Sequence, residues 1–116
     1  MTTDAFRLSP QQEGFLYHAV KDATPGLFLT QVVVDLGSAV EPHRLRTAWA
    51  RVIEAHPALR TIILWDGLDT PLQVVRDQAD LPFDVGPLPD DMEVWLAADR
   101  ARGIDLAKAP LMRVAL

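Results

Sequence analysis

Residues 42–76 read PHRLRTAWARVIEAHPALRTIILWDGLDTPLQVVR, and they carry the strongest signals for the fold class. The first half repeats apolar side chains three and four residues apart, which is the spacing of one helix face. These positions are Leu45, Ala48, Trp49, Val52, Ile53 and His56. Pro57 cannot continue a helix, so the pattern predicts a helix that starts near Pro42 and stops at Pro57. We expect Trp49, at the centre of the stripe, to be a core residue between this helix and a sheet.

The second half of the stretch predicts a β-hairpin. Two runs rich in Leu, Ile and Val, residues 59–65 and 72–76, flank a loop that reads DGLDTP. Gly and Pro stand in this loop where a short connection between strands needs them. Arg60 alternates with Leu59 and Thr61 in the first run, so one face must accommodate a guanidinium. Two interpretations stay open: a carboxylate pairs with Arg60, or Arg60 is a solvated residue at the sheet edge.

The flanking sequence adds two helices and two strands. Residues 9–12 (SPQQ) combine an N-cap serine, a first-turn proline and a capping-box glutamine, which predicts a helix ending near Asp22. Residues 90–102, followed by glycine, predict another helix. Residues 30–36 (TQVVVDL) and 111–116 (LMRVAL) predict strands. The order of elements predicts an α/β sandwich with helices on one face of a mixed or antiparallel sheet.

Composition and charge limit the classes of function. The 116 residues are 49% hydrophobic and 23% charged, which is typical of one folded domain or part of one, and no apolar run is long enough to cross a membrane. The net charge of −5 and the lack of a Lys/Arg cluster disfavour nucleic acid as a partner. The chain has no cysteine, which excludes thiolate catalysis, disulfides and cysteine-based zinc sites. The first residues do not resemble a signal peptide, so we expect a cytoplasmic location.

The residue types that carry catalysis form no recognisable constellation. The candidates are His18, His43, His56, Ser9, Ser38 and the pair Asp90-Asp91. The histidines lack metal-ligand spacing, and no Gly-x-Ser-x-Gly elbow or Gly-rich phosphate loop occurs. His56 could act as a general base, but we favour an imidazole that ends the helix stripe and hydrogen-bonds a nearby carbonyl. We assign the serines and the acidic pair to helix starts and turns, and we name no catalytic, cofactor-binding or metal-binding residue.

Four segments resemble the condensation domains of nonribosomal peptide synthetases. LSPQQEGFLYHAV (8–20) resembles the first core motif, in the variant LSPxQEGxLFH, and AHPALRT (55–61) resembles the second, RHxxLRT. PLQVV (71–75) is similar to the strand that follows, and GIDLAKAPLMRVAL (103–116) to the FDLxxxPLxRxxL stretch that leads into the catalytic motif. The four segments come in family order. The departures are modest: Gly14 replaces the arginine of the generic first motif, and Ala55, Pro57 and Ile104 stand where Arg, Glu and Phe are usual.

The resemblance implies a fold like chloramphenicol acetyltransferase, with two lobes and a tunnel between them. Residues 1–116 would be the N-terminal part of the first lobe. The resemblance also implies that donor and acceptor carrier-protein domains present phosphopantetheine thioesters, so no cofactor is bound directly by this chain. The family joins these thioesters by an amide bond at an HHxxxDG motif. This chain has no His-His pair, so we expect a segment that ends before that motif and is inactive alone.

Two alternatives stay open at this point. The chain could be a free-standing interaction module that binds a carrier protein or a synthetase subunit without catalysis. It could also belong to a related acyltransferase, such as an epimerisation or ester-forming enzyme. The donor and acceptor amino acids cannot be read from these residues.

Overall fold

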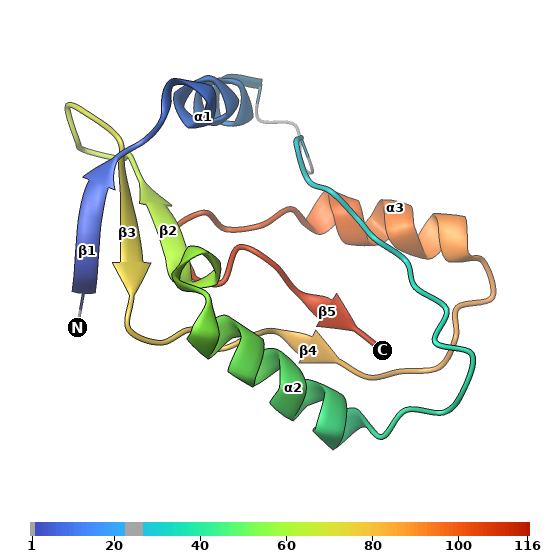
Figure 1. Ribbon diagram of the computed structural model, residues 1–116. Coiled ribbons are helices and arrows are strands. Elements are labelled where there is room, and N and C mark those ends of the chain that lie inside the picture. The colour runs from blue at the N-terminus through green and yellow to red at the C-terminus, as the bar shows by residue number, and fades with distance from the viewer. Residues whose placement is uncertain (1, 23–26) are drawn as a thin grey trace. The chain divides into compact units, whose positions relative to one another are not determined.

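The computed structural model describes residues 2–22 and 27–116, which divide into two compact units (Figure 1). The first, here called the sheet unit, comprises the described residues up to Arg7 together with Leu36–Gly86 and Asp105–Leu116. The second, here called the helical unit, comprises the described residues of Leu8–Asp35 and of Pro87–Ile104. Helices and strands together give the α/β composition that the sequence predicted.

The sheet unit is built around a three-stranded antiparallel sheet in the order β1-β3-β2 (Figure 1). β2 (Thr61–Leu64) and β3 (Leu72–Arg76) form the predicted hairpin. The turn between them places Gly67 at a φ of 73°, and the Leu68 amide donates to the Trp65 carbonyl at 3.1 Å. Glycine adopts this left-handed conformation without steric cost.

The strand β1 (Thr2–Arg7) was not predicted from the sequence. Its residues, TTDAFR, lack the continuous apolar or β-branched run of a buried strand. It forms because the free edge of β3 offers backbone partners, in an antiparallel register that pairs Arg7 with Leu72. That pairing joins residues far apart in the chain, so the local sequence carries little sign of it.

The predicted second helix is confirmed as α2 (Pro42–Ala55). The Glu41 carboxylate caps its start by accepting hydrogen bonds from the backbone amides of His43 and Arg44, each at 2.9 Å. A short 3₁₀ helix, η1 (Pro57–Arg60), follows at once. The predicted strand 59–65 therefore begins two residues late, because Pro57 starts a helical turn that takes up its first two positions.

The core of the sheet unit consists of aliphatic and aromatic side chains from α2, β2, β3 and β4 (Phe83–Asp84): Ile53, Ile62, Val74, Val75 and Phe83. Ile53 is 2% exposed and is the buried residue of α2. Trp49 is only partly buried, so the expectation that it is a core residue is wrong. The apolar stripe of α2 was placed correctly, but its buried residue, Ile53, lies one helical turn after Trp49, near the C-terminal end of the helix that meets η1.

A pair of short strands completes the sheet unit. β4 (Phe83–Asp84) and β5 (Val114–Ala115) pair in parallel. The strand predicted for residues 111–116 is thus confirmed only at Val114 and Ala115, and β4 was not predicted from the sequence. Next to β2, the Ile63 amide donates to the Leu106 carbonyl at 2.8 Å, so residues around Leu106 occupy the sheet edge that β3 leaves open.

The helical unit contains the other two predicted helices, α1 (Pro10–Asp22) and α3 (Met92–Arg102). Asp91 caps α3 by accepting from the amides of Glu93 and Val94, and Gly103 ends it with a φ of 64°. Among the described residues, no helix combines the length and the apolar character that crossing a membrane requires.

The strand predicted over residues 30–36 is absent from the structure, which shows irregular extended chain there. The Gln31 amide group instead contacts α3: its Nε2 donates to the Leu96 carbonyl and to an Asp99 carboxylate oxygen, and its Oε1 accepts from Arg100, each at 2.9 Å. β-branched residues favour an extended chain, but a strand also needs a neighbouring backbone to pair with. No strand among the described residues pairs with this segment, and Val32 is 80% exposed.

Candidate functional site

Two polar residues of the first motif segment, Ser9 and Gln12, form a capping box at the start of α1. The Ser9 hydroxyl accepts from the Gln12 amide at 3.2 Å, and the Gln12 side-chain oxygen accepts from the Ser9 amide at 2.8 Å. Two backbone donors that the helix cannot satisfy are thereby paired. The predicted N-cap role of Ser9 is confirmed.

His56 closes α2 rather than facing a reacting group. Its Nδ1 lies 2.8 Å from the Val52 carbonyl oxygen, one turn back along the helix. A carbonyl oxygen only accepts, so Nδ1 must carry the proton and donate it. This is the interpretation favoured from the sequence, in which His56 ends the apolar stripe and hydrogen-bonds a nearby carbonyl.

Arg60 binds three backbone carbonyls. Its Nε donates to the Arg76 carbonyl at 3.0 Å, and its Nη1 donates to the Ile53 carbonyl at 2.9 Å and to the Glu54 carbonyl. The alternative of a carboxylate partner is therefore wrong, and so is that of a merely solvated edge residue. A cation on the last carbonyls of a helix is favoured by the helix dipole, and the same side chain also holds the end of β3.

The fourth segment is held by a turn that was not predicted from the sequence. The Asp105 carboxylate accepts from the Ala107 amide at 2.9 Å, and the Lys108 amide donates to the Asp105 carbonyl at 3.2 Å. An aspartate that accepts from the amide two residues on forms an Asx turn, and the IDLAK sequence could have suggested one. This turn presents the Leu106 carbonyl to β2.

The remaining candidates do not converge. His43 and His56 stand at opposite ends of α2, whose 14 residues span about 20 Å. His18, in the helical unit, is exposed and lies 3.9 Å from the Asp22 carboxylate one turn further on. Among residues 2–22 and 27–116, no three His, Asp or Glu side chains come close enough to hold a metal ion.

Aromatic rings gather around α1 in the helical unit. The ring centroids of Phe15 and Phe28 lie 4.6 Å apart, and the His18 ring stands edge-on to Phe28 at 6.5 Å. Phe28 has a φ of 62°, which is uncommon for a bulky residue. Packing against Phe15 helps to hold Phe28 in this conformation. The His18 ring contacts the rings of both Tyr17 and Phe28.

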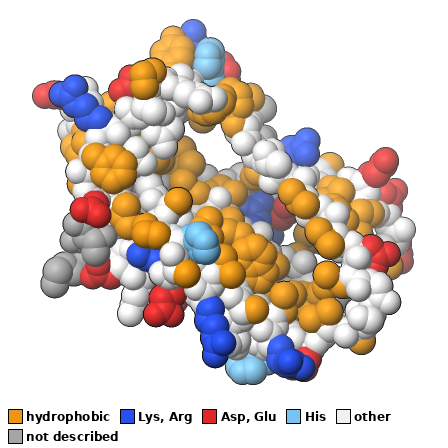
Figure 2. Space-filling view, in the orientation of Figure 1, with side chains coloured by type: hydrophobic (Ala, Val, Ile, Leu, Met, Phe, Trp, Pro, Cys, Tyr) orange, Lys and Arg blue, Asp and Glu red, His pale blue; other side chains and the backbone are white. Residues whose placement is uncertain are grey.

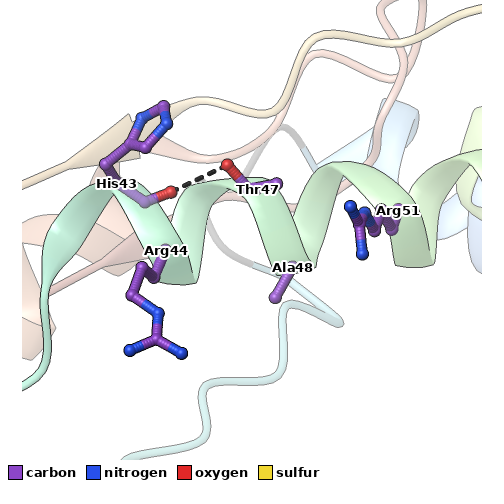
Figure 3. Close-up of a pocket in the computed structure, with 5 residues that line it drawn as sticks. All are labelled: His43, Arg44, Thr47, Ala48 and Arg51. Carbon is purple, nitrogen blue, oxygen red and sulfur yellow. Dashed lines mark hydrogen bonds between the residues drawn. The ribbon is translucent and has the colours of Figure 1, made fainter.

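Two shallow hollows lie in the sheet unit. One, with a volume of about 360 Å³, is lined by His43, Arg44, Thr47, Ala48 and Arg51 of α2 (Figure 3). The other, of about 460 Å³, is lined by residues of β2 and of the segments 76–80 and 107–109. The residues that line each hollow do not include a nucleophile next to a general base. The hydrogen bonds described above show that the motif residues instead cap helices, form turns and link elements.

A family profile for the condensation domain matches residues 2–116. The chain belongs to the condensation-domain family. Curated relatives include a linear gramicidin synthase of Brevibacillus parabrevis, 33% identical over 118 residues that cover 95% of this chain and 2% of that protein. Tyrocidine synthase 2 of the same organism is 35% identical over 121 residues, which cover 97% of this chain and 3% of that protein. Malformin synthetase of Aspergillus vadensis is 35% identical over 114 residues, with coverage of 97% and 2%.

Two solved structures share the fold of this chain. The starter condensation domain of the rhizomide synthetase superposes with a TM-score of 0.73 at 18% identity, covering 98% of this chain and 29% of that chain. The tallysomycin biosynthesis protein TlmII gives a TM-score of 0.64 at 24% identity, with coverage of 97% and 30%. The resemblance recognised in the four motif segments is confirmed.

Proposed function

We propose that this chain is the N-terminal segment of a condensation domain that joins carrier-bound thioesters by an amide bond within a nonribosomal peptide synthetase. The family match over residues 2–116 carries this proposal. The chain corresponds to 29–30% of the two solved proteins named above, and to 2–3% of the three synthetases. Most of such a protein therefore lies outside these residues.

The proposed role of this segment is structural. The polar motif residues are used in capping α1, closing α2 and shaping the turn at Asp105. The His-His pair of the HHxxxDG motif does not occur in the 116 residues. In the proposed enzyme, residues outside this chain supply the reacting groups.

The proposed partners are donor and acceptor carrier-protein domains of a larger synthetase. Each carries a phosphopantetheine arm whose thioester holds the aminoacyl or peptidyl group. The amine of the acceptor attacks the donor carbonyl, the carbon–sulfur bond to the donor arm breaks, and the donor thiol is released. This chain binds no cofactor of its own in the proposal.

A chimera tests the proposed function. The 118-residue region matched in the linear gramicidin synthase is replaced by this chain, and dipeptidyl thioester is measured from loaded carrier proteins. We expect the chimera to form the amide, whereas a control in which the region is deleted forms none. A chimera that folds but forms no product would contradict the proposal.

Two further observations concern the chain itself, and the second separates the proposed segment from the alternative interaction module. We expect no dipeptidyl thioester above a no-enzyme control when the chain is mixed with loaded carrier proteins, because the His-His motif is absent. The reading frame after the Leu116 codon provides the second observation. A frame that soon encodes HHxxxDG supports the proposal, whereas a stop codon supports the interaction module.

A further inference from the structure

One face of α2 combines two arginines with small side chains. Arg44, Ala48 and Arg51 follow one another at spacings of four and three residues, which places them on one side of the helix. Thr47 lies beside them, and its hydroxyl donates to the His43 carbonyl at 2.9 Å (Figure 3). This face, here called the arginine face, lines the hollow of about 360 Å³. It is turned away from Ile53, the buried residue of the helix.

The two arginines of this face are available to a partner. Both are exposed, and neither forms an ion pair with another residue of the described chain. Arg46, on another side of α2, differs from them. Its guanidinium stacks 4.8 Å from the centre of the Phe83 ring and donates to the Phe83 carbonyl at 3.3 Å. The guanidinium groups of Arg44 and Arg51 therefore keep unused hydrogen-bond donors, whereas the guanidinium group of Arg46 is engaged with Phe83.

The charge of α2 is opposite to that of the chain. The helix contains three arginines and one glutamate, while the whole chain carries −5. In the space-filling view, Lys/Arg and His side chains recur along the edge where Figure 1 draws α2 (Figure 2). The Glu41 carboxylate, just before the helix, is occupied with backbone amides. At physiological salt, screening limits the reach of charge to about 8 Å, so a partner would sense this local face more than the distant acidic groups.

The shape of the face fits an α-helix. Between the two arginines the surface carries only Thr47 and Ala48, and small side chains allow helix axes to approach closely. Arg44 and Arg51 are seven residues apart, so their Cα atoms are separated by about 10 Å along the axis. Carboxylates seven residues apart on a second helix have the same spacing. Each guanidinium presents a planar pair of donors that matches a carboxylate.

We propose that the arginine face of α2 is a docking site for an acidic helix of a partner protein, with carboxylates about seven residues apart. An extended polyanion fits less well, because it would also meet the acidic remainder of a chain with a net charge of −5. The proposal concerns binding and is independent of the amide-forming reaction.

The test uses a synthetic helical peptide as the probe. The peptide is alanine-rich, about 21 residues long so that it forms a helix, and carries glutamates seven residues apart on one face. Its matched control carries glutamine at the same positions. Fluorescence anisotropy measures the binding of each peptide to the 116-residue chain. We expect the glutamate peptide to bind at least about tenfold more tightly than the control, and to weaken as salt is raised.

Variants of the chain separate the arginine face from general charge effects. R44E/R51E should lose at least about tenfold in affinity for the glutamate peptide, because each pairing of an arginine with a peptide glutamate becomes a pairing of two glutamates. R7E/K108E makes the same change in net charge at exposed positions elsewhere in the sheet unit and should bind as the original chain does. Circular dichroism of both variants checks that the helix content is unchanged.

Four outcomes would overturn the proposal. The first is equal binding of the glutamate and glutamine peptides, or no measurable binding of either. The second is an equal loss in both double variants. The third is tighter binding of single-stranded DNA of about 20 nucleotides than of the glutamate peptide, which would make the face a polyanion site. If R44E/R51E instead abolishes self-association of the chain, the occupant is a second copy and the assignment to a separate acidic partner is wrong.

Discussion

Several polar side chains of this chain form hydrogen bonds with backbone groups that would otherwise lack a partner. Arg60 is the clearest case, because one guanidinium binds carbonyls at the end of α2 and at the end of β3. A carboxylate partner was one expectation from the sequence, since arginines within a sheet commonly pair with one. Backbone carbonyls at a helix C-terminus offer the same negative potential without another charged residue.

Replacing Arg60 should destabilise the sheet unit. We expect Arg60→Ala to lower the free energy of unfolding by about 1–3 kcal/mol, because three carbonyls lose a charged donor. Arg60→Lys keeps the charge but not the planar fork, so it should recover only part of the loss. Urea denaturation measures both variants. If Arg60→Lys is as stable as the original chain, the fork geometry contributes nothing and charge alone accounts for the role of Arg60.

Ile53, rather than Trp49, is the side chain through which α2 enters the core. Ile53→Ala should cost about 2–4 kcal/mol, because Ile53 is 2% exposed and its loss leaves a cavity. Val52→Ala is the matched control at a neighbouring position that is 39% exposed, and it should cost less than half as much. Thermal unfolding compares the two variants. If Ile53→Ala does not fold, Ile53→Val should still lower stability by about 0.5–1.5 kcal/mol. Equal effects at both positions would contradict the assignment of the buried face.

At the level of elements, helices were predicted well and strands unevenly. α1, α2 and α3 each begin after a capping residue that accepts from backbone amides: Ser9, Glu41 and Asp91. These signals lie within a few residues of the helix they start, so the sequence alone predicted the Ser9 cap and placed Asp91 at a helix start, whereas the Glu41 cap was not predicted. Strands depend on a second strand. The β2–β3 hairpin was predicted because its partner is adjacent in the chain, whereas β1 was missed and residues 30–36 were wrongly assigned.

The cap of α1 can be tested at its first residue. Ser9→Ala removes the acceptor for the Gln12 amide and should lower stability by about 0.5–2 kcal/mol, with loss of helical signal. Ser38→Ala, in an exposed bend, is the control and should change stability by less than about 0.5 kcal/mol. Circular dichroism with urea titration measures both. A larger effect at Ser38 than at Ser9 would show that the capping box is not what holds the start of α1.

Across the whole chain, apolar surface is left uncovered on strand-forming sequence. Val32, Val33 and Val34 are 80%, 59% and 67% exposed in a segment without a strand partner among the described residues. β5 pairs with β4 in a sheet of only two strands. An extended β-branched segment or a short sheet with open edges exposes unpaired backbone groups, and these can pair with the same groups of a second chain. We therefore expect the isolated chain to associate with itself.

Lysines in the valine segment should reduce this association. V32K/V34K introduces charge where pairing would bring backbones together, so sedimentation should shift from dimers or larger species toward monomers. L88K/V94K is the control, because Leu88 and Val94 are 82% and 65% exposed outside that segment, and it should sediment as the original chain does. An original chain that is already a monodisperse, cooperatively unfolding monomer would contradict the expectation and favour the interaction module.

The helices, the β2–β3 hairpin and the family could be predicted from the sequence, because each rests on residues close together in the chain or on motif segments read in order. The N-cap role of Ser9 and the closing role of His56 were also predicted, since both are local hydrogen bonds. The place of β1, the depth of Trp49 and Ile53, and the carbonyl partners of Arg60 became visible only in the folded chain. These features depend on which distant backbone lies alongside. Which residue of a helix stripe is buried, and which strand pairs with a sheet edge, depend on neighbours in the tertiary structure, and the periodicity of the sequence does not identify these neighbours.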